Sequence, residues 1–283
     1  FKPANEKIHF NDFLTITDSL LQINETDFVF GPETMILQAI NEEHPEESDS
    51  YNSLLQLKRK YPKTEFLIGV HSYLKLDDEI PAGSRFNADE NYYYEAFNSA
   101  LFLDENNNTS FYHKTKLVPL FERMPFVQYL NFLGKYSLEL GGYNGTYSDR
   151  NTLNSFTTSD STLIFPIVCF ESVFGDYCAQ RIDDSSGFIC MITNDGWWKN
   201  SLGYKYHFDF SRLRAIENRR QIVRVANNGI SAIINTKVNL NNKLHGGKVD
   251  ICKERSNFSL EKHSIQLMET LLVGFQPSLQ SFY

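Results

Sequence analysis

The 283 residues, 41% of them hydrophobic and 22% charged, are typical of a folded globular protein with a sizeable core rather than of a disordered chain. The formal net charge of -8 argues against a nucleic-acid partner, because phosphate binding needs a basic surface. No stretch approaches the roughly 20 consecutive apolar residues that a membrane-spanning helix needs, and no signal peptide opens the chain.

Short apolar runs that end at polar residues or glycine predict buried strands. In chain order these runs are Asp27–Phe30, Phe66–Val70, Ala100–Leu103, Leu163–Cys169, Phe188–Thr193, Val223–Ala226 and Ser231–Ile234. Helical patterns lie between them, one carrying Leu54 and Leu57 before Pro62 and one over Tyr206–Arg220. Strands that alternate with helices predict an α/β layered domain.

Polar segments predict loops at 41–50, 104–108 and 141–159. The last segment is long, contains glycine and precedes the strand that ends at Cys169. Its length is typical of an active-site lid, although a surface excursion without a role is an alternative.

The cysteines form no C-x-x-C pair and show no His/Cys spacing typical of zinc, so neither a disulfide framework nor a metal site is expected. No cofactor is expected either. Cys190 lies within an apolar strand, which is typical of a buried thiol, and nothing around Cys178 and Cys252 indicates reactivity. Cys169 is the candidate for a reactive cysteine.

Three chemically useful side chains follow apolar strands. Glu33 comes directly after Gly31-Pro32, where partial burial would make it a usable base. Lys114 follows aromatic residues and offers a positive charge for an oxyanion. Cys169 stands where a strand meets a polar turn, and a carboxylate and an ammonium could activate it there. Taken singly, the alternatives are an acid at a helix N-terminus, an edge-strand lysine and a buried thiol.

The order Glu, Lys, Cys and the strings around these residues resemble the nitrilase superfamily, and within it the apolipoprotein N-acyltransferase family. The resemblance covers roughly residues 1–237. Its strings are Gly31-Pro32-Glu33-Thr34, Tyr112-His113-Lys114, Leu117-Val118-Pro119, Cys169-Phe170-Glu171-Ser172-Val173-Phe174, Thr193-Asn194-Asp195-Gly196-Trp197-Trp198, Arg212-Leu213-Arg214-Ala215-Ile216-Glu217 and Asn227-Asn228-Gly229-Ile230-Ser231. The resemblance implies an α/β fold, the nitrilase-like α-β-β-α sandwich.

The resemblance also implies roles for particular residues. Three are implied to be catalytic: Glu33 as the base, Lys114 as the oxyanion partner and Cys169 as the nucleophile. Glu122 is implied to orient the lysine, and the remaining implied supporting residues are Phe170, Glu171, Asn194 and Trp197.

Two departures from the family pattern bear on loop geometry rather than on the triad. The usual Phe-Gly before the second glutamate is Leu120-Phe121 here, and Phe170 stands where many members carry Tyr.

The implied activity is transfer of a fatty acyl chain from a phospholipid to the N-terminal amine of a diacylglyceryl-cysteine apolipoprotein, through a Cys169 thioester. The implied partners are this phospholipid, this apolipoprotein and a membrane, reached through segments absent from the chain. The implied place is the bacterial inner membrane, with the catalytic domain facing the periplasm. Trp197 and Trp198 would line a lipid groove or pack against a loop.

Two other functions are open. A soluble carbon-nitrogen hydrolase that cleaves a small amide or nitrile would use the same triad, and a non-catalytic remnant would serve as a binding module. The Trp197-Trp198 loop and the string Leu117-Val118-Pro119 favour the acyltransferase.

The ends of the chain suggest a domain division. We expect residues 1–237 to form the catalytic domain, with an N-terminal membrane part and the first strand of the domain missing. Residues 238–283 are expected to be a non-native or poorly ordered tail. The neighbouring reading frame of 263–274 can encode a string similar to the family's closing motif, which suggests a frameshift near Lys237.

Overall fold

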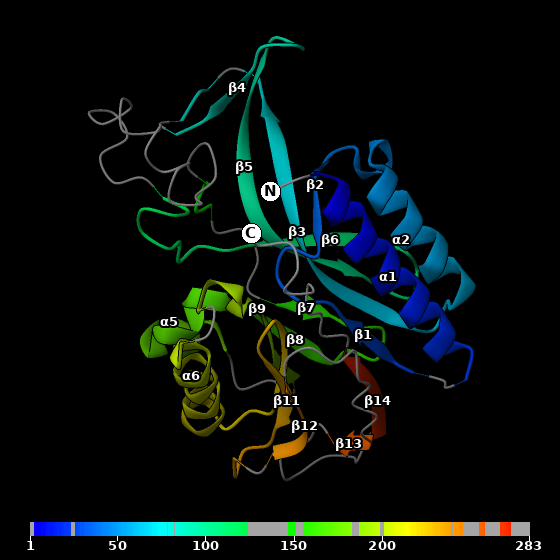
Figure 1. Cartoon of the computed structure of the whole chain (residues 1–283), viewed down its shortest axis with the longest axis vertical. Coiled ribbons are helices and arrows are strands. Elements are labelled where there is room, and N and C mark those ends of the chain that lie inside the picture. The colour runs from blue at the N-terminus through cyan, green and yellow to red at the C-terminus, as the bar shows by residue number, and fades with distance from the viewer. Residues whose placement is uncertain are drawn as a thin grey trace.

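Two β-sheets pack face to face, and helices cover the outer side of each (Figure 1). The computed structural model describes residues 3–23, 26–77, 79–81, 83–123, 147–150, 155–182, 187–198, 201–238, 240–245, 255–257 and 267–272. This arrangement is the α-β-β-α sandwich expected from the sequence.

The first sheet has eight strands in the order β13-β14-β1-β3-β5-β4, with β2 paired to β3 and β6 paired to β5. Parallel pairing joins β1 to β3, and β3 runs antiparallel to β5 along their whole length. The strands are β1 (Phe28–Phe30), β2 (Ile36–Asn41), β3 (Glu65–Leu76), β4 (Arg85–Asn87), β5 (Tyr92–Leu103), β6 (Thr109–His113), β13 (Arg255–Asn257) and β14 (Leu267–Leu272).

The second sheet has six strands in the order β12-β11-β10-β9-β8-β7. Its central strands β8, β9 and β10 are parallel, so their carboxyl ends lie at one edge of the sheet. The strands are β7 (Phe156–Thr157), β8 (Leu163–Val168), β9 (Gly187–Asn194), β10 (Ile222–Asn227), β11 (Ile230–Ile234) and β12 (Leu240–His245).

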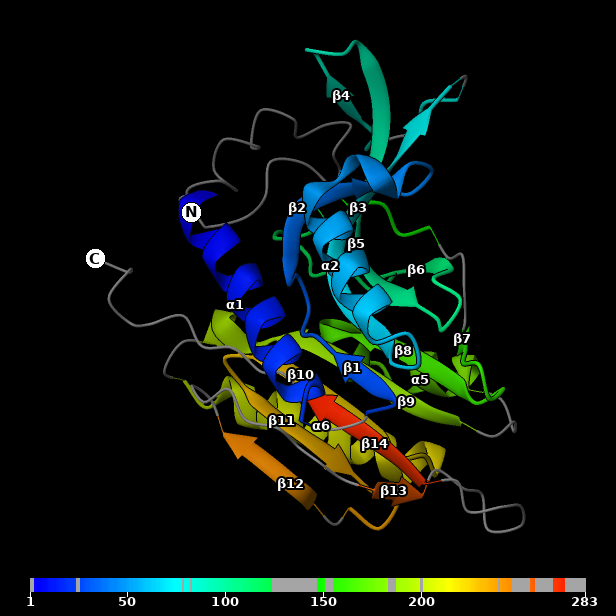
Figure 2. The same cartoon turned by 90° about the vertical axis from the view of Figure 1, so that its right-hand side faces the viewer.

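Helices α1 (Pro3–Leu21) and α2 (Asp49–Lys60) lie side by side on the first sheet, as Figure 2 shows. Helices α5 (Gly175–Arg181) and α6 (Gly203–Asn218) cover the second sheet. Short 3-10 turns are η1 (Pro45–Glu47), η3 (Cys169–Val173) and η4 (Asp195–Trp198). No helix in the described part of the chain is long and apolar enough to cross a membrane.

The core between the sheets is built from the inward faces of both. Phe28 and Phe30 of β1 meet Phe188 of β9, with ring centroids 5.9 and 6.1 Å apart. Burial of each such side chain stabilises the fold by about 1.5–3 kcal/mol. The apolar runs therefore hold the two sheets in contact, and this contact brings their strand ends together.

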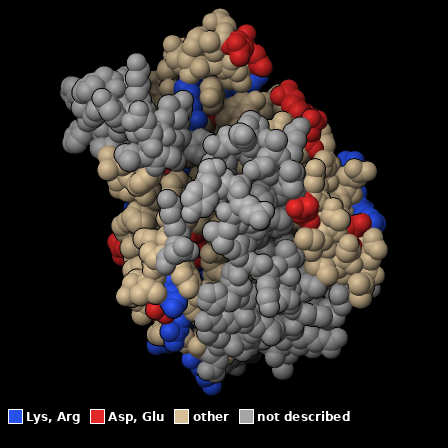
Figure 3. Space-filling view, in the orientation of Figure 1, with Lys and Arg blue, Asp and Glu red and all other residues tan. Residues whose placement is uncertain are grey.

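Charged side chains also lie at the surface. Figure 3 shows Asp and Glu near the tip of the hairpin formed by β3 and β5, and Lys and Arg near α6. Both signs of charge are present on this face.

All seven predicted strands are present, and both predicted helices correspond to α2 and α6. The sequence did not predict α1, although Phe10, Phe13 and Leu21 bury one side of it against the sheet. Strands β3 and β5 are longer than expected, because antiparallel pairing continues past the apolar part into the tyrosine-rich hairpin.

The division of the chain at Lys237 stays a proposal. Beyond that point the backbone of β12 pairs with β11, and β14 pairs in parallel with β1. Residues 246–254, 258–266 and 273–283 lie outside the described residues. Sequencing the encoding DNA across residue 237 tests the frameshift.

Candidate active site

Glu33 lies just past the carboxyl end of β1 and is only 3% exposed. Its loop crosses directly over Gly69 of β3, whose amide donates to the Pro32 carbonyl oxygen at 3.2 Å. A Cβ at Gly69 would come within 2.5 Å of the Glu33 Cα, so this approach needs a glycine. The strand beneath thus fixes where the carboxylate is held.

Lys114 follows β6 and is 1% exposed. Its Nζ donates to Glu33 Oε1 at 2.9 Å and to Glu122 Oε1 at 2.8 Å. Burial alone would lower the pKa of Lys114, but the two carboxylates outweigh it and raise this pKa well above the ordinary value. The lysine therefore stays cationic and bridges the two acids.

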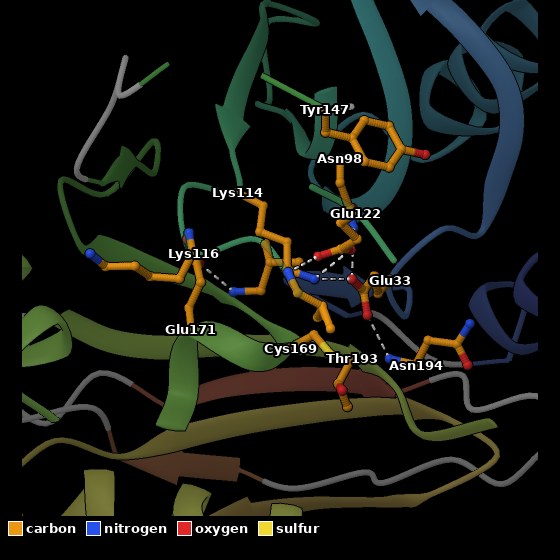
Figure 4. Close-up of polar contacts among 12 residues, drawn as sticks. Glu33, Asn98, Lys114, Lys116, Glu122, Tyr147, Cys169, Glu171, Thr193 and Asn194 are labelled. Carbon is orange, nitrogen blue, oxygen red and sulfur yellow. Dashed lines mark hydrogen bonds and ion pairs between the residues drawn. The ribbon is translucent and has the colours of Figure 1, made fainter. Parts of the chain in front are cut away.

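Two backbone amides and one side-chain amide hold the carboxylates. The Asn98 side-chain amide donates to Glu33 at 2.8 Å and to Glu122 at 3.0 Å. The Asn194 backbone N–H donates to Glu33 Oε2 at 2.8 Å, while its own side chain points away (Figure 4). The Val118 backbone N–H donates to Glu122 Oε2 at 2.8 Å. Both acids are thus fixed by hydrogen bonds as well as by charge.

Cys169 begins η3 directly after β8 and adopts a positive φ of 50°. Few residues other than glycine adopt this conformation, so the turn is strained at its first residue. The sulfur lies between the side chains of Lys114 and Thr193, close to Glu33 (Figure 4). Cys169 is half-buried, whereas Cys178 and Cys190 are fully buried. The three candidate catalytic residues therefore meet, and Cys169 is the most accessible cysteine among those described.

Burial, and after it the nearby Glu33 carboxylate, raises the pKa of the Cys169 thiol to about 12. Lys114 and a hydrogen bond with Thr193 act in the opposite direction. The resting site consequently holds a neutral thiol, and attack by the sulfur requires a base to take its proton.

This pKa predicts an unusual pH profile for alkylation of Cys169 by iodoacetamide, measured by peptide mapping. Thiolate is the reactive form, so the rate should rise about tenfold per pH unit from pH 7 to 10, without levelling near the ordinary value of about 8.5. Glutathione under the same conditions is the control, and its profile should level near pH 9. A plateau for Cys169 below pH 9 would contradict the raised pKa.

Glu171 is a fully buried clamp rather than a group that faces the sulfur. Its carboxylate accepts from the Val168 backbone N–H at 2.8 Å, the Tyr112 hydroxyl at 2.6 Å and the Thr115 backbone N–H at 2.7 Å. It thereby ties the turn that carries Cys169 to the segment that follows Lys114.

Aromatic side chains line the surface beside the site. The ring of Phe121 lies 5.5 Å from that of Trp197, and both side chains are exposed. Leu120 has a φ of 70°, so the departure from the family's Phe-Gly string coincides with a strained leucine. Phe170 is half-buried and its ring contacts Phe174.

Sequence reasoning missed Asn98 and Thr193, which both contact the triad. A polar residue inside the buried strand β5 was the only sequence signal for Asn98.

Most of the predicted lid, at 141–146 and 151–154, lies outside the described residues. Tyr147 lies between these two segments, and its backbone N–H donates to the Glu122 carbonyl oxygen at 3.0 Å. No cluster of acidic, His or Cys side chains suited to a metal ion occurs in the described ranges.

A two-sheet sandwich with a carboxylate, a lysine and a cysteine at one edge defines a nitrilase-like protein. The chain belongs to the carbon-nitrogen hydrolase family, whose model matches residues 15–248. Among solved structures it is similar to Nit3 of Saccharomyces cerevisiae, a member of branch 10 of the nitrilase superfamily. The TM-score is 0.59 at 12% identity, covering 86% of this chain and 82% of Nit3.

Curated relatives are named apolipoprotein N-acyltransferase. The protein from Rickettsia typhi is 32% identical over 213 residues, which cover 66% of this chain and 42% of the relative. The protein from Wigglesworthia glossinidia brevipalpis is 30% identical over 238 residues, which cover 82% of this chain and 42% of the relative. The chain thus spans about two-fifths of the length of these relatives.

Proposed function

We propose that this chain carries the catalytic site of an N-acyltransferase, which moves a fatty acyl chain from a phospholipid to the N-terminal amine of a diacylglyceryl-cysteine apolipoprotein. The observation that carries this proposal is the Lys114 ammonium, held between Glu33 and Glu122 beside a half-buried, neutral Cys169 thiol. The names of the curated relatives support N-acyl transfer as the reaction.

In the first half-reaction Glu33 takes the thiol proton as the Cys169 sulfur attacks the ester carbonyl carbon of the phospholipid. Two of the three N–H groups of Lys114 donate to carboxylates. The third would donate to the developing oxyanion, together with the Phe170 backbone N–H. Collapse breaks the ester bond, and the lysophospholipid oxygen leaves with the proton held by Glu33. A thioester remains on Cys169.

In the second half-reaction the lipoprotein amine attacks the thioester carbon, and Glu33 takes a proton from this amine. The tetrahedral intermediate collapses with cleavage of the carbon–sulfur bond, and the sulfur regains its proton from Glu33. The product is an amide, so the sequence is ping-pong nucleophilic catalysis.

The proposal also concerns where the reaction occurs. Exposed aromatic side chains at Phe121, Trp197 and Trp198 are suited to an acyl chain or a lipid surface. We propose that this domain acts at the bacterial inner membrane, on its periplasmic side, as its resemblance to the apolipoprotein N-acyltransferase family implies. The alternative that the aromatics only pack against the 141–159 segment predicts that tryptophan fluorescence does not change when lipid is added.

Acylation of Cys169 tests the proposal. We expect the chain, incubated with dioctanoyl phosphatidylethanolamine in detergent micelles, to gain the mass of one octanoyl group on the Cys169 peptide. The Cys169→Ser variant should gain none, because the hydroxyl is a much weaker nucleophile beside the same base. Cys178→Ala, which removes another buried thiol, should still be acylated.

Acyl-enzyme formation by Cys169→Ser, or no acyl-enzyme formation by the unmodified chain, would contradict the scheme.

The fate of the acyl group distinguishes this transferase from a second candidate function, hydrolysis. The carbon-nitrogen hydrolase family favours hydrolysis of a small amide or nitrile as that second candidate. Release of free octanoate at the same rate with and without a diacylglyceryl-cysteine peptide would favour the hydrolase.

A further inference from the structure

A buried polar chain reaches Cys169 from the side opposite to Lys114. His207 of α6 is 5% exposed, and its Nε2 lies 3.1 Å from the Cys169 carbonyl oxygen. Its Nδ1 lies 2.7 Å from Asp195 Oδ1, and Asp195 Oδ2 accepts from Arg224 at 2.7 Å. The Ser172 hydroxyl donates to the same Cys169 carbonyl oxygen at 2.7 Å. None of these side chains has a role in the scheme above.

Contacts at both ring nitrogens hold His207 in place. Nε2 lies 3.1 Å from the Cys169 carbonyl oxygen and 3.0 Å from the Ser172 hydroxyl, which itself reaches the same carbonyl oxygen. On the other side of the ring Nδ1 contacts Asp195. Burial alone would raise the pKa of Asp195, but Arg224 and His207 outweigh it and this pKa is lowered. A carbonyl oxygen only accepts, so His207 can hold it through a hydrogen on Nε2.

The Cys169 carbonyl and the Phe170 N–H belong to one peptide unit. In a planar trans peptide these two groups point in opposite directions. The carbonyl points toward α6, which covers the outer side of the second sheet. The Phe170 N–H is therefore directed to the inner side, where Lys114 and Glu33 enter from the first sheet. A hydrogen-bond donor that binds the carbonyl oxygen also polarises the peptide and strengthens its N–H as a donor.

We infer that His207, anchored by Asp195, positions the oxyanion donor of this site by holding the Cys169 carbonyl so that the Phe170 N–H faces the reacting acyl oxygen. His207 is a positioning residue, because it acts through the peptide and does not touch the substrate. It also holds Cys169 in its left-handed conformation, whose φ is 50°. The inference rests on the proposed function, since it concerns the same acylation step.

Two reactions of the same sulfur test the inference. Acylation by p-nitrophenyl octanoate develops a negative oxygen and needs the oxyanion donor. Alkylation by iodoacetamide displaces iodide at carbon and needs only an accessible thiol. We expect His207→Leu to slow acylation about tenfold or more, somewhat less than the ~10²–10³-fold loss on removing an oxyanion donor outright. Alkylation of Cys169 at the same pH should change less than about threefold.

His207→Gln keeps a neutral donor near the carbonyl and should lose less acylation than His207→Leu. It also decides the matter if the leucine variant does not fold. Phe208→Leu, which removes buried packing from the next position of α6, is the matched control for destabilisation and should leave the ratio of the two rates unchanged. As a second readout, the thioester carbonyl stretch of the acylated His207 variants should shift to higher frequency, because the hydrogen bond to that oxygen is weaker.

Equal losses in both reactions, or no loss in either, would overturn the inference, because a merely structural histidine would not separate them. The proposed function fails differently. In that case the unmodified chain is not acylated at Cys169 at all, or it releases the acyl group to water at the same rate with and without the amine acceptor, whatever stands at position 207.

Discussion

Glu33→Gln is expected to slow acylation of Cys169 by about 10²–10⁴-fold, the usual contribution of a general base. The amide keeps the shape of the side chain, and its oxygen can still accept from the Asn194 N–H. It cannot take the thiol proton, and burial, the largest of the causes that raise the pKa of that thiol, remains in the variant. The measurement is the burst of p-nitrophenolate from p-nitrophenyl octanoate.

Glu65→Gln is the matched control for this change. Glu65 is a buried carboxylate at the start of β3, where it accepts from the Ser159 backbone N–H at 3.0 Å, far along the strand from Gly69. Its replacement should leave the burst unchanged. A burst from Glu33→Gln as fast as that of the unmodified chain would show that another group removes the proton.

Arg224→Met should lower the free energy of unfolding by about 3–5 kcal/mol, the cost of leaving a buried charge without its partner. Arg224 and Asp195 are both fully buried and lie 2.7 Å apart. The guanidinium also donates to the Ile230 carbonyl oxygen and the Ser211 hydroxyl. Removing it leaves Asp195 with His207 as its remaining side-chain partner. Urea unfolding followed by circular dichroism measures the loss.

Arg214→Met provides the comparison, because Arg214 is also buried but its partner Glu217 is about half exposed and can be hydrated. Its replacement should lower the free energy of unfolding clearly less than that of Arg224.

The stability lost on replacing Arg224 should also depend on pH. The lowered pKa of Asp195 stabilises the fold above the pKa of the unfolded state, about 3.9, and this contribution is lost as the pH falls through the folded pKa. The difference between Arg224→Met and the unmodified chain should therefore shrink in acid, and a pH-independent difference would contradict this account.

Strand positions were predictable where burial alone decides them. The runs around Phe28, Phe188 and Val223 are apolar because both faces of their strands are covered. The far half of β3 and all of β14 followed no such pattern. Their extension depends on pairing with a distant strand, which leaves no local periodicity.

The candidate site divides in the same way. Glu33, Lys114 and Cys169 could be proposed because each follows an apolar strand and lies in a recognisable string. Asn98 could not, since an amide within a strand has meaning only once two carboxylates from other strands are seen to accept from it. Glu171 was expected to support the site, but its place as a clamp behind Cys169 emerged only from its partners.

The sequence by itself indicated the layered α/β class and the places of seven strands along the chain, because local burial decides these. The strings around Glu33, Lys114 and Cys169 made these residues the candidates for catalysis. The tertiary structure alone decided that Lys114 bridges two acids, that the Cys169 thiol stays protonated and that His207 holds the neighbouring peptide. These properties depend on distances between residues as far apart in the chain as Glu33 and Cys169, and such distances exist only after the two sheets have packed.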